Sequence, residues 1–346
     1  MMQRLRTQAH THVRRSFATK AKSDNLQEKL VALCRHRGFI FPGSEIYGGL
    51  ANSFDYGPLG TQMKKNIQDR WWFEFVQKRP NCLGLDSSVL MNSAVWNASG
   101  HVENFTDPMT HAIPCPNCGE VHAFQQAKKF NLLFRTNMGA TEETCDWIYL
   151  RPETAQGAYI NFAHVQSTMR KKLPFGVGQM GKSFRNEISP GHFLFRTREF
   201  EQLELQFFTH PDESDKWFDY WVDECYNFLL KYGLKPENLR KHEHEKEELA
   251  HYARATTDIQ FKYPFGWSEL WGIANRTNFD LKKHMDAKVL GRKRTVLRLH
   301  PDIAPYRFAV LPLVKKEPLL QVAQKLFEDL SFGSSIHKDD KLAPLA

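Results

Sequence analysis

The sequence predicts an α+β fold, with antiparallel strands and helices alternating irregularly along the chain. Residues 147–210 have a strand-like pattern broken by turns at Pro152, Gly157 and later Pro and Gly positions. Residues 213–232 have a strong amphipathic helical pattern that ends at Gly233. A regular succession of strand, helix and strand is absent, which disfavours a parallel sheet.

Other segments carry weaker signals of the same kind. The patterns predict helices at 24–37, 61–78, 235–252 and 317–330, and strands with turns at 265–281 and 311–314. The helix at 61–78 follows a Gly- and Pro-containing turn and has several aromatic residues near its end, Trp71, Trp72, Phe73 and Phe75. A helix end this apolar is expected in the core or at a subunit interface.

Positive charge is concentrated at the N-terminus. The 346 residues have a formal charge of +8, and residues 1–23 contain six basic residues and no acidic one, so the rest of the chain has +2. A basic, acid-free N-terminus predicts a mitochondrial or plastid transit peptide, and a basic tail is the alternative. A second location in the cytosol is left open.

Composition excludes two classes of protein. No apolar run approaches the length of about 18 residues that a membrane span needs, so no membrane partner is expected. The 13% aromatic and 25% charged residues exclude a disordered chain.

The six cysteines are scattered and follow no secretory signal, which disfavours a disulfide framework. Cys115 and Cys118 have the spacing of half a zinc knuckle. Zinc normally takes four ligands, and His111, His122 and Cys145 are the candidates to complete the set. The preferred interpretation is a turn without metal, so Zn²⁺ is not expected.

A polar hairpin is the main candidate for chemistry. Residues 184–187 are followed by a Pro-Gly loop and by residues 195–208, where Gln202, Glu204 and Gln206 alternate with apolar residues. One face of this strand is therefore packed, and the other presents polar groups. Arginine binds phosphate, a carboxylate binds an amine, and an aromatic ring can stack on a base. The alternative is a surface hairpin with cross-strand ion pairs.

Several strings carry a family resemblance. Phe184–Glu187 and Arg196–Phe200 resemble the second signature motif of class II aminoacyl-tRNA synthetases, and Tyr56–Asp69 resembles the first motif, a dimer-interface helix. Strings resembling the glycyl-tRNA synthetase family in particular are Ser99–His101, Leu150–Gly157, Gly181–Glu187, Gly266–Arg276 and Arg294–Pro305. The resemblance covers residues 27 to about 330.

The resemblance implies that glycine attacks the α-phosphate of ATP and that the glycyl group then passes to tRNA(Gly). It makes Arg185 and Glu187 the expected catalytic residues. The expected ATP site consists of Arg185, Asn186, Glu187, Phe195, Arg196, Thr197, Arg198, Glu199, Phe200, Glu269 and Leu270. The expected glycine site consists of Glu153, Phe200, Glu201, Gln202, Leu203 and Glu204. Phe200 is expected under the adenine, and Glu269 is expected to hold Mg²⁺.

Each of these roles has a structural alternative. Glu153 can be a turn carboxylate beside Pro152, and Glu269 can form a strand-end ion pair with Arg276. Arg198 can contact either tRNA or phosphate. A homodimer is expected from the family and from the apolar helix at 61–78.

The sequence departs from the family at two places. The third class II motif, a strand and helix, is expected between Leu281 and Arg294, but residues 282–293 are too few to form it. The second departure is the anticodon-binding domain, for which residues 294–346 are too few.

The expected domains are a transit peptide at 1–23, a catalytic core at 24–293 and a shortened anticodon-binding domain at 294–346.

These gaps leave a second hypothesis open, that of a catalytically impaired, synthetase-like binding protein. It would be a splice isoform or a paralogue comparable to a polymerase accessory subunit. A different class II synthetase is disfavoured by the strings at 151–157 and 266–276.

Overall fold

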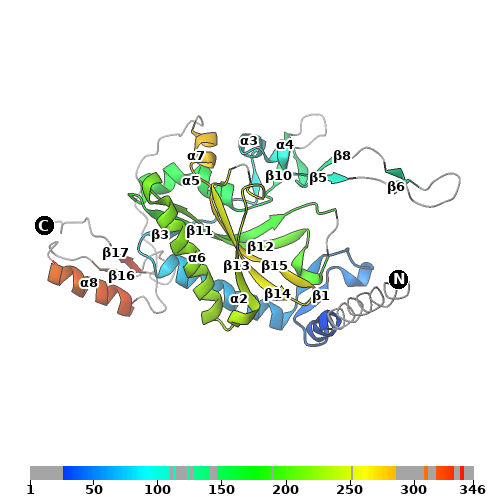
Figure 1. Cartoon of the computed structure of the whole chain (residues 1–346), viewed down its shortest axis with the longest axis horizontal. Helices are drawn as coiled ribbons and strands as arrows, with labels where there is room; N and C mark the ends of the chain where they lie inside the picture. Colours follow the sequence, from blue (N-terminus) through cyan, green and yellow to red (C-terminus); the bar gives the residue numbers. More distant parts are fainter. Residues whose placement is uncertain are drawn as a thin grey trace, which may run out of the picture.

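The structure is a computed structural model of the chain (Figure 1). It describes residues 26–109, 112–113, 123–124, 128–139, 146–188, 191–250, 252–285, 308–310, 317–330 and 336–338.

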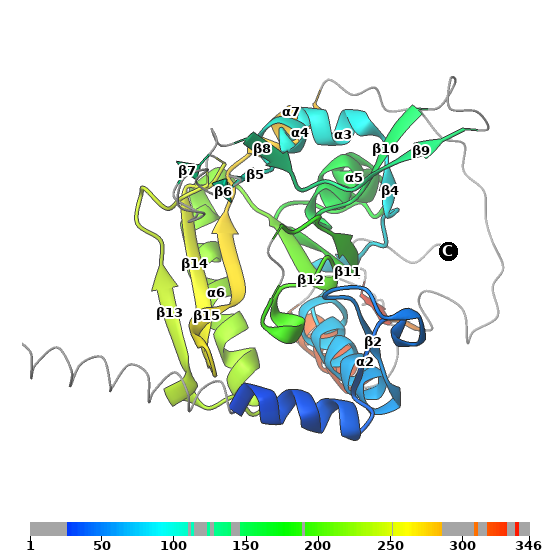
Figure 2. The ribbon, with the colours of Figure 1, turned by 90° about the vertical axis from the view of Figure 1, so that its right-hand side faces the viewer.

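Two three-stranded sheets lie at the centre of the molecule (Figures 1 and 2). The first has the order β12-β11-β3, with β12 at Glu199–Phe208, β11 at Phe175–Phe184 and β3 at Cys82–Gly84. The second has the order β13-β14-β15, with β13 at Leu239–Glu243, β14 at Ala255–Tyr263 and β15 at Gly266–Asn275. All neighbours are antiparallel except β3 and β11, which are parallel. Mixed helices and antiparallel sheets confirm the predicted α+β fold class.

Smaller sheets surround these two. A third three-stranded sheet has the order β4 (Leu90–Met91), β10 (Asp146–Leu150) and β9 (Arg135–Met138). Two-stranded pairs join β1 (Ile40–Pro42) to β2 (Phe54–Tyr56), β5 (Thr106–Met109) to β8 (Lys128–Asn131), β6 (Ala112–Ile113) to β7 (Ala123–Phe124), and β16 (Phe308–Val310) to β17 (Ile336–Lys338).

The first described helix covers residues 26–36. The others are α2 (Pro58–Trp72), α3 (Ser93–Ala98), α4 (His101–Asn104), α5 (Ala155–Thr168), α6 (Ser214–Lys231), α7 (Phe279–His284) and α8 (Glu317–Leu330). A wide helical turn, Phe73–Gln77, continues α2, and short 3₁₀ turns occur at Glu45–Tyr47, Phe193–Phe195, Pro211–Glu213 and Pro236–Asn238. The predicted helices near 24–37, 61–78, 213–232 and 317–330 are confirmed.

Two local predictions are wrong. The strand pattern expected across 147–210 contains α5, whose Ala155, Ala158 and Tyr159 are buried at helical spacing against the sheet. The charged segment at 235–252 was expected to be helical but contains β13. Leu239 is buried there and β13 pairs along its whole length with β14, so tertiary pairing outweighs the helix propensity of its charged residues.

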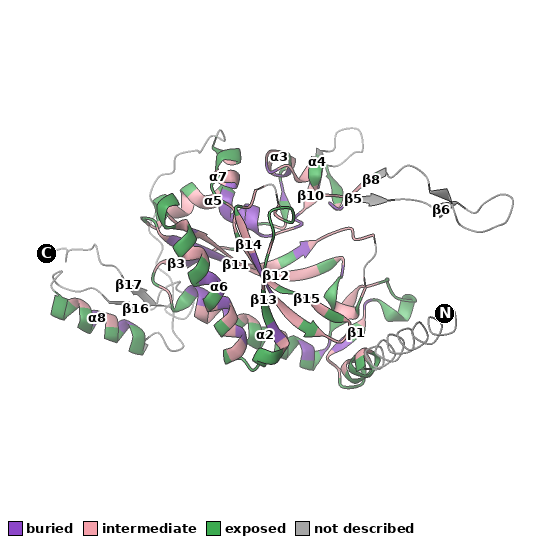
Figure 3. Cartoon of the chain, in the orientation of Figure 1, coloured by how far each residue is buried: buried purple, intermediate pink, exposed green. Residues whose placement is uncertain are grey.

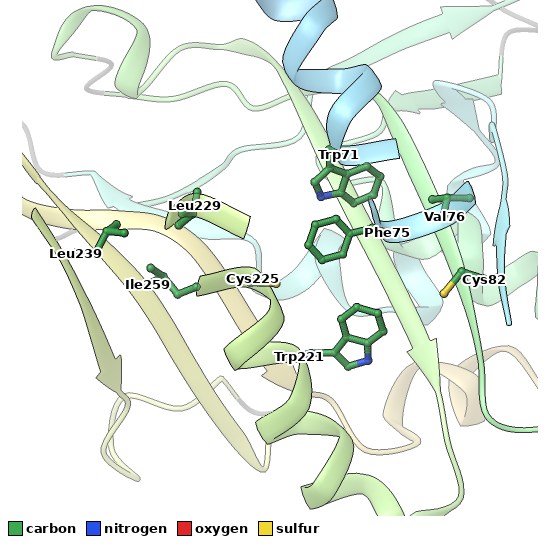
Figure 4. Close-up of a cluster of buried hydrophobic side chains, with 9 residues drawn as sticks. All are labelled: Trp71, Phe75, Val76, Cys82, Trp221, Cys225, Leu229, Leu239 and Ile259. Carbon is green, nitrogen blue, oxygen red and sulfur yellow. The ribbon is translucent and has the colours of Figure 1, made fainter. Parts of the chain in front are cut away.

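Aromatic residues join the two sheets into one core (Figure 4). Trp71 and Phe75 at the end of α2 stack with ring centroids 5.4 Å apart, and Phe75 stacks on Trp221 of α6. The apolar face of α6 is buried against the sheets and its other face is exposed (Figure 3). The apolar end of the 61–78 helix therefore lies in the core, one of the two predicted places.

Among the described residues, no helix is both long and apolar enough to cross a membrane.

Candidate active site

A cluster of polar side chains lies where β12 passes the N-terminal end of α5. Glu204 of β12 accepts hydrogen bonds from the hydroxyl of Thr154 and, at 3.1 Å, from the amide nitrogen of Gln202. The Gln202 side-chain oxygen accepts from the Thr154 backbone N–H and from the Ser183 hydroxyl, at 3.2 and 2.8 Å. Gln202 therefore has a fixed orientation and holds Glu204 in place.

The carboxylates of Glu153 and Glu204 have opposite electrostatic environments. Burial, and after it the charge of Glu153, raise the pKa of Glu204 to about 7. Burial also opposes ionisation of Glu153, but a hydrogen bond from His101 and the charge of Arg276 outweigh it and lower the pKa of Glu153 to about 2. At neutral pH Glu153 is therefore ionised, and the Glu204 carboxyl is about half protonated.

A network behind Glu153 fixes that carboxylate. Its oxygen lies 3.5 Å from the His101 Nε2 atom, 3.9 Å from the Arg276 Nη2 atom and 3.2 Å from the donating Gln156 amide. Arg276 is held in turn by Asp280, at 2.9 Å, and its guanidinium lies over the ring of Tyr252. Glu153 therefore belongs to a network of charged and polar side chains, and it is more than a turn carboxylate beside Pro152.

Arg185 binds the described part of the protein through only one of its three guanidinium nitrogens. Its guanidinium lies over the rings of Phe105 and Phe200, at 5.4 and 5.2 Å, and its Nε donates to the Pro152 carbonyl at 3.1 Å. Its two terminal nitrogens have no hydrogen bond or ion pair with any residue that the structure describes. The charge of Arg185 lowers the pKa values of both Glu204 and Glu269, so it lies within electrostatic reach of both carboxyls.

A second arginine, Arg151, lies close to the same strands but is buried and uses its Nε and Nη1 atoms on the protein. It is 2% exposed, and it donates to the Lys182 carbonyl at 2.8 Å and to the Ser87 carbonyl at 2.7 Å. A Cβ on Gly181 would lie 2.2 Å from its Nη2 atom, so the approach of this guanidinium requires glycine there. Arg151 therefore supports the sheet.

Two predicted glycine-site residues point elsewhere. The carboxylate of Glu201 is bound by Lys64 and Gln68 of α2, and Leu203 packs on the aromatic core. Both have odd numbers in a strand whose even-numbered residues face the carboxylate cluster, and side chains alternate along a strand. The structure brings together only Glu153, Gln202 and Glu204 of that set, with Phe200 beside Arg185.

The predicted ATP residues of the hairpin are spread over a wider surface. Glu187 lies 4.0 Å from Arg196, whose side chain is 57% exposed, and Glu199 pairs with Lys182 on the sheet surface. Phe195 packs edge-on against Tyr263 and Phe265. The other three residues bond to backbone carbonyls. The Asn186 N–H donates to the carbonyl of Leu132, and the Thr197 hydroxyl donates to that of Glu199. The Arg198 guanidinium donates to the carbonyl of Ala51.

Glu269 lies on β15 beside another carboxyl. Its pKa is raised by burial and by Asp258, and its Oε1 atom lies near Gly272, where a Cβ would approach it to 2.9 Å. Arg276 pairs with Asp280 and Glu153, so the alternative ion pair between Glu269 and Arg276 does not form. Leu270 is 39% exposed on the same strand.

Within the described residues, no group of three or more acidic, His or Cys side chains is arranged to hold a metal by itself. Glu269 and Asp258 nevertheless fit Mg²⁺ in one respect, because this ion is often held by one or two carboxylates together with substrate phosphates. Cys115 and Cys118 lie outside the described residues.

Several residues of the network were not among the predicted ligands, including Phe105, Gln156, Arg276 and Asp280. Gln156 and Arg276 lie in the strings Leu150–Gly157 and Gly266–Arg276, so the sequence resemblance included them but assigned them no function. Asp280 is 2% exposed and holds both Arg276 and the Gln156 amide, at 2.8 Å from the latter. Nothing in the local sequence distinguishes it from a surface aspartate.

Comparison with known proteins places this site in a family. Residues 122–309, more than half of the chain, match the tRNA synthetase class II core domain (G, H, P, S and T). The chain is 46% identical to a glycine–tRNA ligase of Caldanaerobacter subterraneus, over 88% of this chain and 83% of the relative. It is 46% identical to that of Geobacillus kaustophilus, over 88% and 84%, and 44% identical to that of Bacillus anthracis, over 90% and 86%. The chain therefore belongs to the glycine–tRNA ligase family of class II synthetases.

These alignments also show a difference in length inside the matched region. The first spans 387 positions, of which this chain fills about 304, since 88% of its 346 residues are aligned. The Bacillus anthracis relative aligns over 397 positions, of which this chain fills about 311. Each relative thus has about 85 residues with no counterpart in this chain.

Proposed function

We propose that this chain is a glycine–tRNA ligase that activates glycine with ATP and transfers it to tRNA(Gly). The observation that carries the proposal is the arrangement of Arg185, whose terminal nitrogens bond to no residue that the structure describes, within electrostatic reach of Glu204, which in turn lies near Glu153. A cation for phosphate and anions for an ammonium lie next to each other, as joining an amino acid to ATP requires.

The first role of the residues is to hold the amino acid. Glu153 is ionised in the free protein, and an ammonium group brought beside Glu204 favours its ionised form, so glycine binding displaces the proton from Glu204. Thr154 and Gln202 keep the Glu204 carboxylate in position through their hydrogen bonds. Glycine is thereby oriented with its carboxylate free to react.

In the activation step, an oxygen of the glycine carboxylate forms a bond to the α-phosphorus of ATP. The bond from that phosphorus to the bridging oxygen of pyrophosphate breaks, and pyrophosphate leaves with its electron pair. Negative charge grows on the α-phosphate oxygens, where the Arg185 guanidinium stabilises it. Phe105 and Phe200 hold the guanidinium from two sides.

In the transfer step, a ribose hydroxyl oxygen of the tRNA bonds to the glycyl carbonyl carbon, the bond from that carbon to the phosphate oxygen breaks, and AMP leaves with the electron pair while its phosphate takes up the hydroxyl proton. We propose that Glu269 holds Mg²⁺ together with the phosphates of ATP, with Asp258 beside it. The ion would neutralise phosphate charge during activation.

Glycine-dependent exchange of pyrophosphate into ATP tests the proposal. The purified chain should catalyse exchange only when glycine is present, and it should then charge tRNA(Gly). A folded chain that binds neither glycine nor ATP would support the alternative of an impaired, synthetase-like binding protein.

We also propose that the protein is a homodimer that joins through α2. Leu59, Met63 and Ile67 lie on one face of this helix with about half of each side chain exposed, and Ile46 and Tyr47 nearby are 88% and 87% exposed. Apolar side chains gathered in this way are typical of a protein interface.

The mass in solution tests the dimer. Light scattering should give twice the chain mass for the wild type and one chain mass for Met63→Asp, whereas Lys65→Asp serves as the matched control on the polar face of α2. A wild type that remains a monomer at high concentration would refute the interface.

Residues 1–23 are proposed to direct import into a mitochondrion or plastid; they lie outside the described residues. Fusion of residues 1–30 to a fluorescent protein tests this, and a purely cytosolic signal would contradict it. Residues 24–293 are proposed as the catalytic core and 294–346 as part of an anticodon-binding domain. Of the latter, the structure describes α8, β16 and β17.

A further inference from the structure

A β-bulge in β15 changes the direction in which Glu269 points. In the ladder between β14 and β15, Ile259 is paired with Trp271, and the next residue of β14 is paired with Glu269. Leu270 is therefore an extra residue with no counterpart in β14. Side chains alternate along a strand, so without this extra residue Glu269 would lie on the face of Trp271, which packs into the aromatic core. The bulge turns Glu269 to the opposite face, that of Gly272.

Two carboxylates converge over Gly272. The register pairs this residue with Asp258 of β14. A Cβ at position 272 would lie 2.9 Å from the Glu269 Oε1 atom and 3.4 Å from the Asp258 Oδ1 atom, and the first distance is too short for an ordinary contact. The absence of a side chain at Gly272 therefore leaves the space in which the Glu269 carboxylate lies beside Asp258.

His244 holds the second of these carboxylates. Its Nε2 atom lies 2.7 Å from the Oδ2 atom of Asp258, and it is the only hydrogen-bond partner of the Asp258 side chain among the residues that the structure describes. An ionised carboxylate accepts and cannot donate, so Nε2 donates this bond. Asp258 is 8% exposed, whereas Gly272 lies at the surface. The cluster therefore has one buried, oriented carboxylate, and a ligand can approach it from the side of Gly272.

The position of this cluster connects it to the candidate active site. Both carboxyl oxygens lie within 3.4 Å of one point, and two carboxylates this close repel each other unless a proton or a cation joins them. Arg185 lies within electrostatic reach of the Glu269 carboxyl. A cation that accompanies a phosphate bound to Arg185 therefore fits the charge of Glu269 and Asp258.

We propose that Gly272 and His244 are positioning residues for the Glu269 carboxylate in the binding of ATP with Mg²⁺. Gly272 leaves the space that this carboxylate occupies, and His244 orients Asp258 beside it. Both act through the two carboxylates. The inference rests on the proposed role of Glu269 in holding Mg²⁺, and it adds the residues that place Glu269 for that role.

Binding of ATP to the full chain without glycine tests the inference, by calorimetry in excess Mg²⁺ and again in EDTA. Gly272→Ala adds a methyl group that displaces the Glu269 carboxylate, so it should weaken binding in Mg²⁺ at least about tenfold. Binding in EDTA should change by less than about threefold, since Arg185 is untouched. Unfolding in urea should match the wild type, because the new methyl group meets only side-chain ends and alanine suits a strand at least as well as glycine.

Histidine variants test the other half of the cluster. His244→Leu removes the donor to Asp258 and should weaken ATP binding in Mg²⁺ by about tenfold. His244→Gln supplies an amide N–H in place of Nε2 and should restore binding to within about threefold of the wild type. His242→Leu is the matched control, because the Nε2 atom of His242 lies 3.8 Å from Glu248, and it should leave binding unchanged. If Gly272→Ala fails to fold, these three variants decide.

A double substitution shows whether Gly272 acts through Glu269. Glu269→Gln keeps the size of the side chain and removes its charge. In that background Gly272→Ala should have no further effect on ATP binding in Mg²⁺. A further loss of about tenfold would show that Gly272 acts through another group, and it would overturn the assignment.

Two results separate this inference from the proposed function. Suppose that ATP binding by the wild type depends on Mg²⁺ and that Gly272→Ala and His244→Leu bind equally well; this would overturn the inference and leave the proposed function standing. A wild type that binds ATP equally well in Mg²⁺ and in EDTA would overturn the proposed role of Glu269, and this inference with it.

Discussion

Arg151 and Arg185 are far apart in the sequence but lie close together in the fold, where the Phe184 N–H donates to the Arg151 carbonyl and Arg185 donates to the Pro152 carbonyl, and their environments are opposite. Arg151 is buried and donates to carbonyls of Ser87 and Lys182, so it closes a structural network. Arg185 uses only its Nε on the protein and keeps its terminal nitrogens free among the described residues. The difference teaches that burial alone does not mark a ligand-binding arginine: Arg151 is the more buried of the two, yet a terminal nitrogen of Arg151 is bound to the protein and neither terminal nitrogen of Arg185 has a partner among the described residues.

The largest expected effect is loss of activity without loss of fold. Arg185→Ala should lower glycine-dependent pyrophosphate exchange by about 10³-fold, the effect of removing a donor that stabilises transition-state charge. Its free energy of unfolding in urea should change by less than about 1 kcal/mol, because few protein contacts are lost. Exchange at the wild-type rate would refute the role of Arg185.

Arg151→Met should have the opposite effect. The carbonyls of Ser87 and Lys182, which are only partly buried, lose their donor, so we expect the free energy of unfolding to fall by about 1–3 kcal/mol. Urea unfolding followed by circular dichroism measures this. A variant with unchanged stability would show that the network around Ser87 is not structural.

The pH dependence separates Glu204 from Glu153. The pKa of Glu204 is about 7, so below pH 7 the carboxyl is protonated and glycine must displace the proton. The KM for glycine should therefore rise as pH falls, by about tenfold per pH unit. Glu204→Gln should bind glycine more weakly and remove this dependence, and a dependence that persists in this variant would point to another group.

The same shift affects stability. Because the folded protein keeps a proton on Glu204 that the unfolded chain releases between its ordinary pKa of 4.5 and about 7, this carboxyl destabilises the fold as pH rises through that range. Glu204→Gln should remove this contribution, so its free energy of unfolding relative to wild type should increase from pH 4.5 to 7.

The smallest expected effect is at Glu201. Its carboxylate is bound to Lys64 and Gln68 of α2, so Glu201→Gln should change the KM for glycine by less than about threefold. Glu153→Gln is the matched comparison, and it should raise the KM for glycine by about tenfold or more. A large effect at Glu201 alone would place glycine on the other face of β12.

Sequence patterns predicted the hairpin, the fold class and most long helices, because alternation on β12 and amphipathic spacing on α6 are local properties. They missed α5 and β13, since burial of Ala155 and pairing of Leu239 depend on distant strands. The resemblance drew attention to Glu153 and Glu204, two carboxyls that the structure brings together. It did not separate Glu201 from Glu204, although strand alternation already placed them on opposite faces.

Asp280 and Phe105 could not be predicted from local sequence at all. Asp280 acts on Glu153 through Arg276 and Gln156, and Phe105 reaches Arg185 from a loop 80 positions earlier in the chain. Such contacts arise only when separate segments fold together.

The central claim is that Arg185 and the Glu153–Glu204 pair bind one ligand with a phosphate and an ammonium. Calorimetric titration with a non-hydrolysable analogue of glycyl-adenylate tests it most directly. We predict one-to-one binding with release of a proton near pH 7, loss of binding in Arg185→Ala, and loss of the proton release in Glu204→Gln. Binding that is unchanged in both variants would contradict the account.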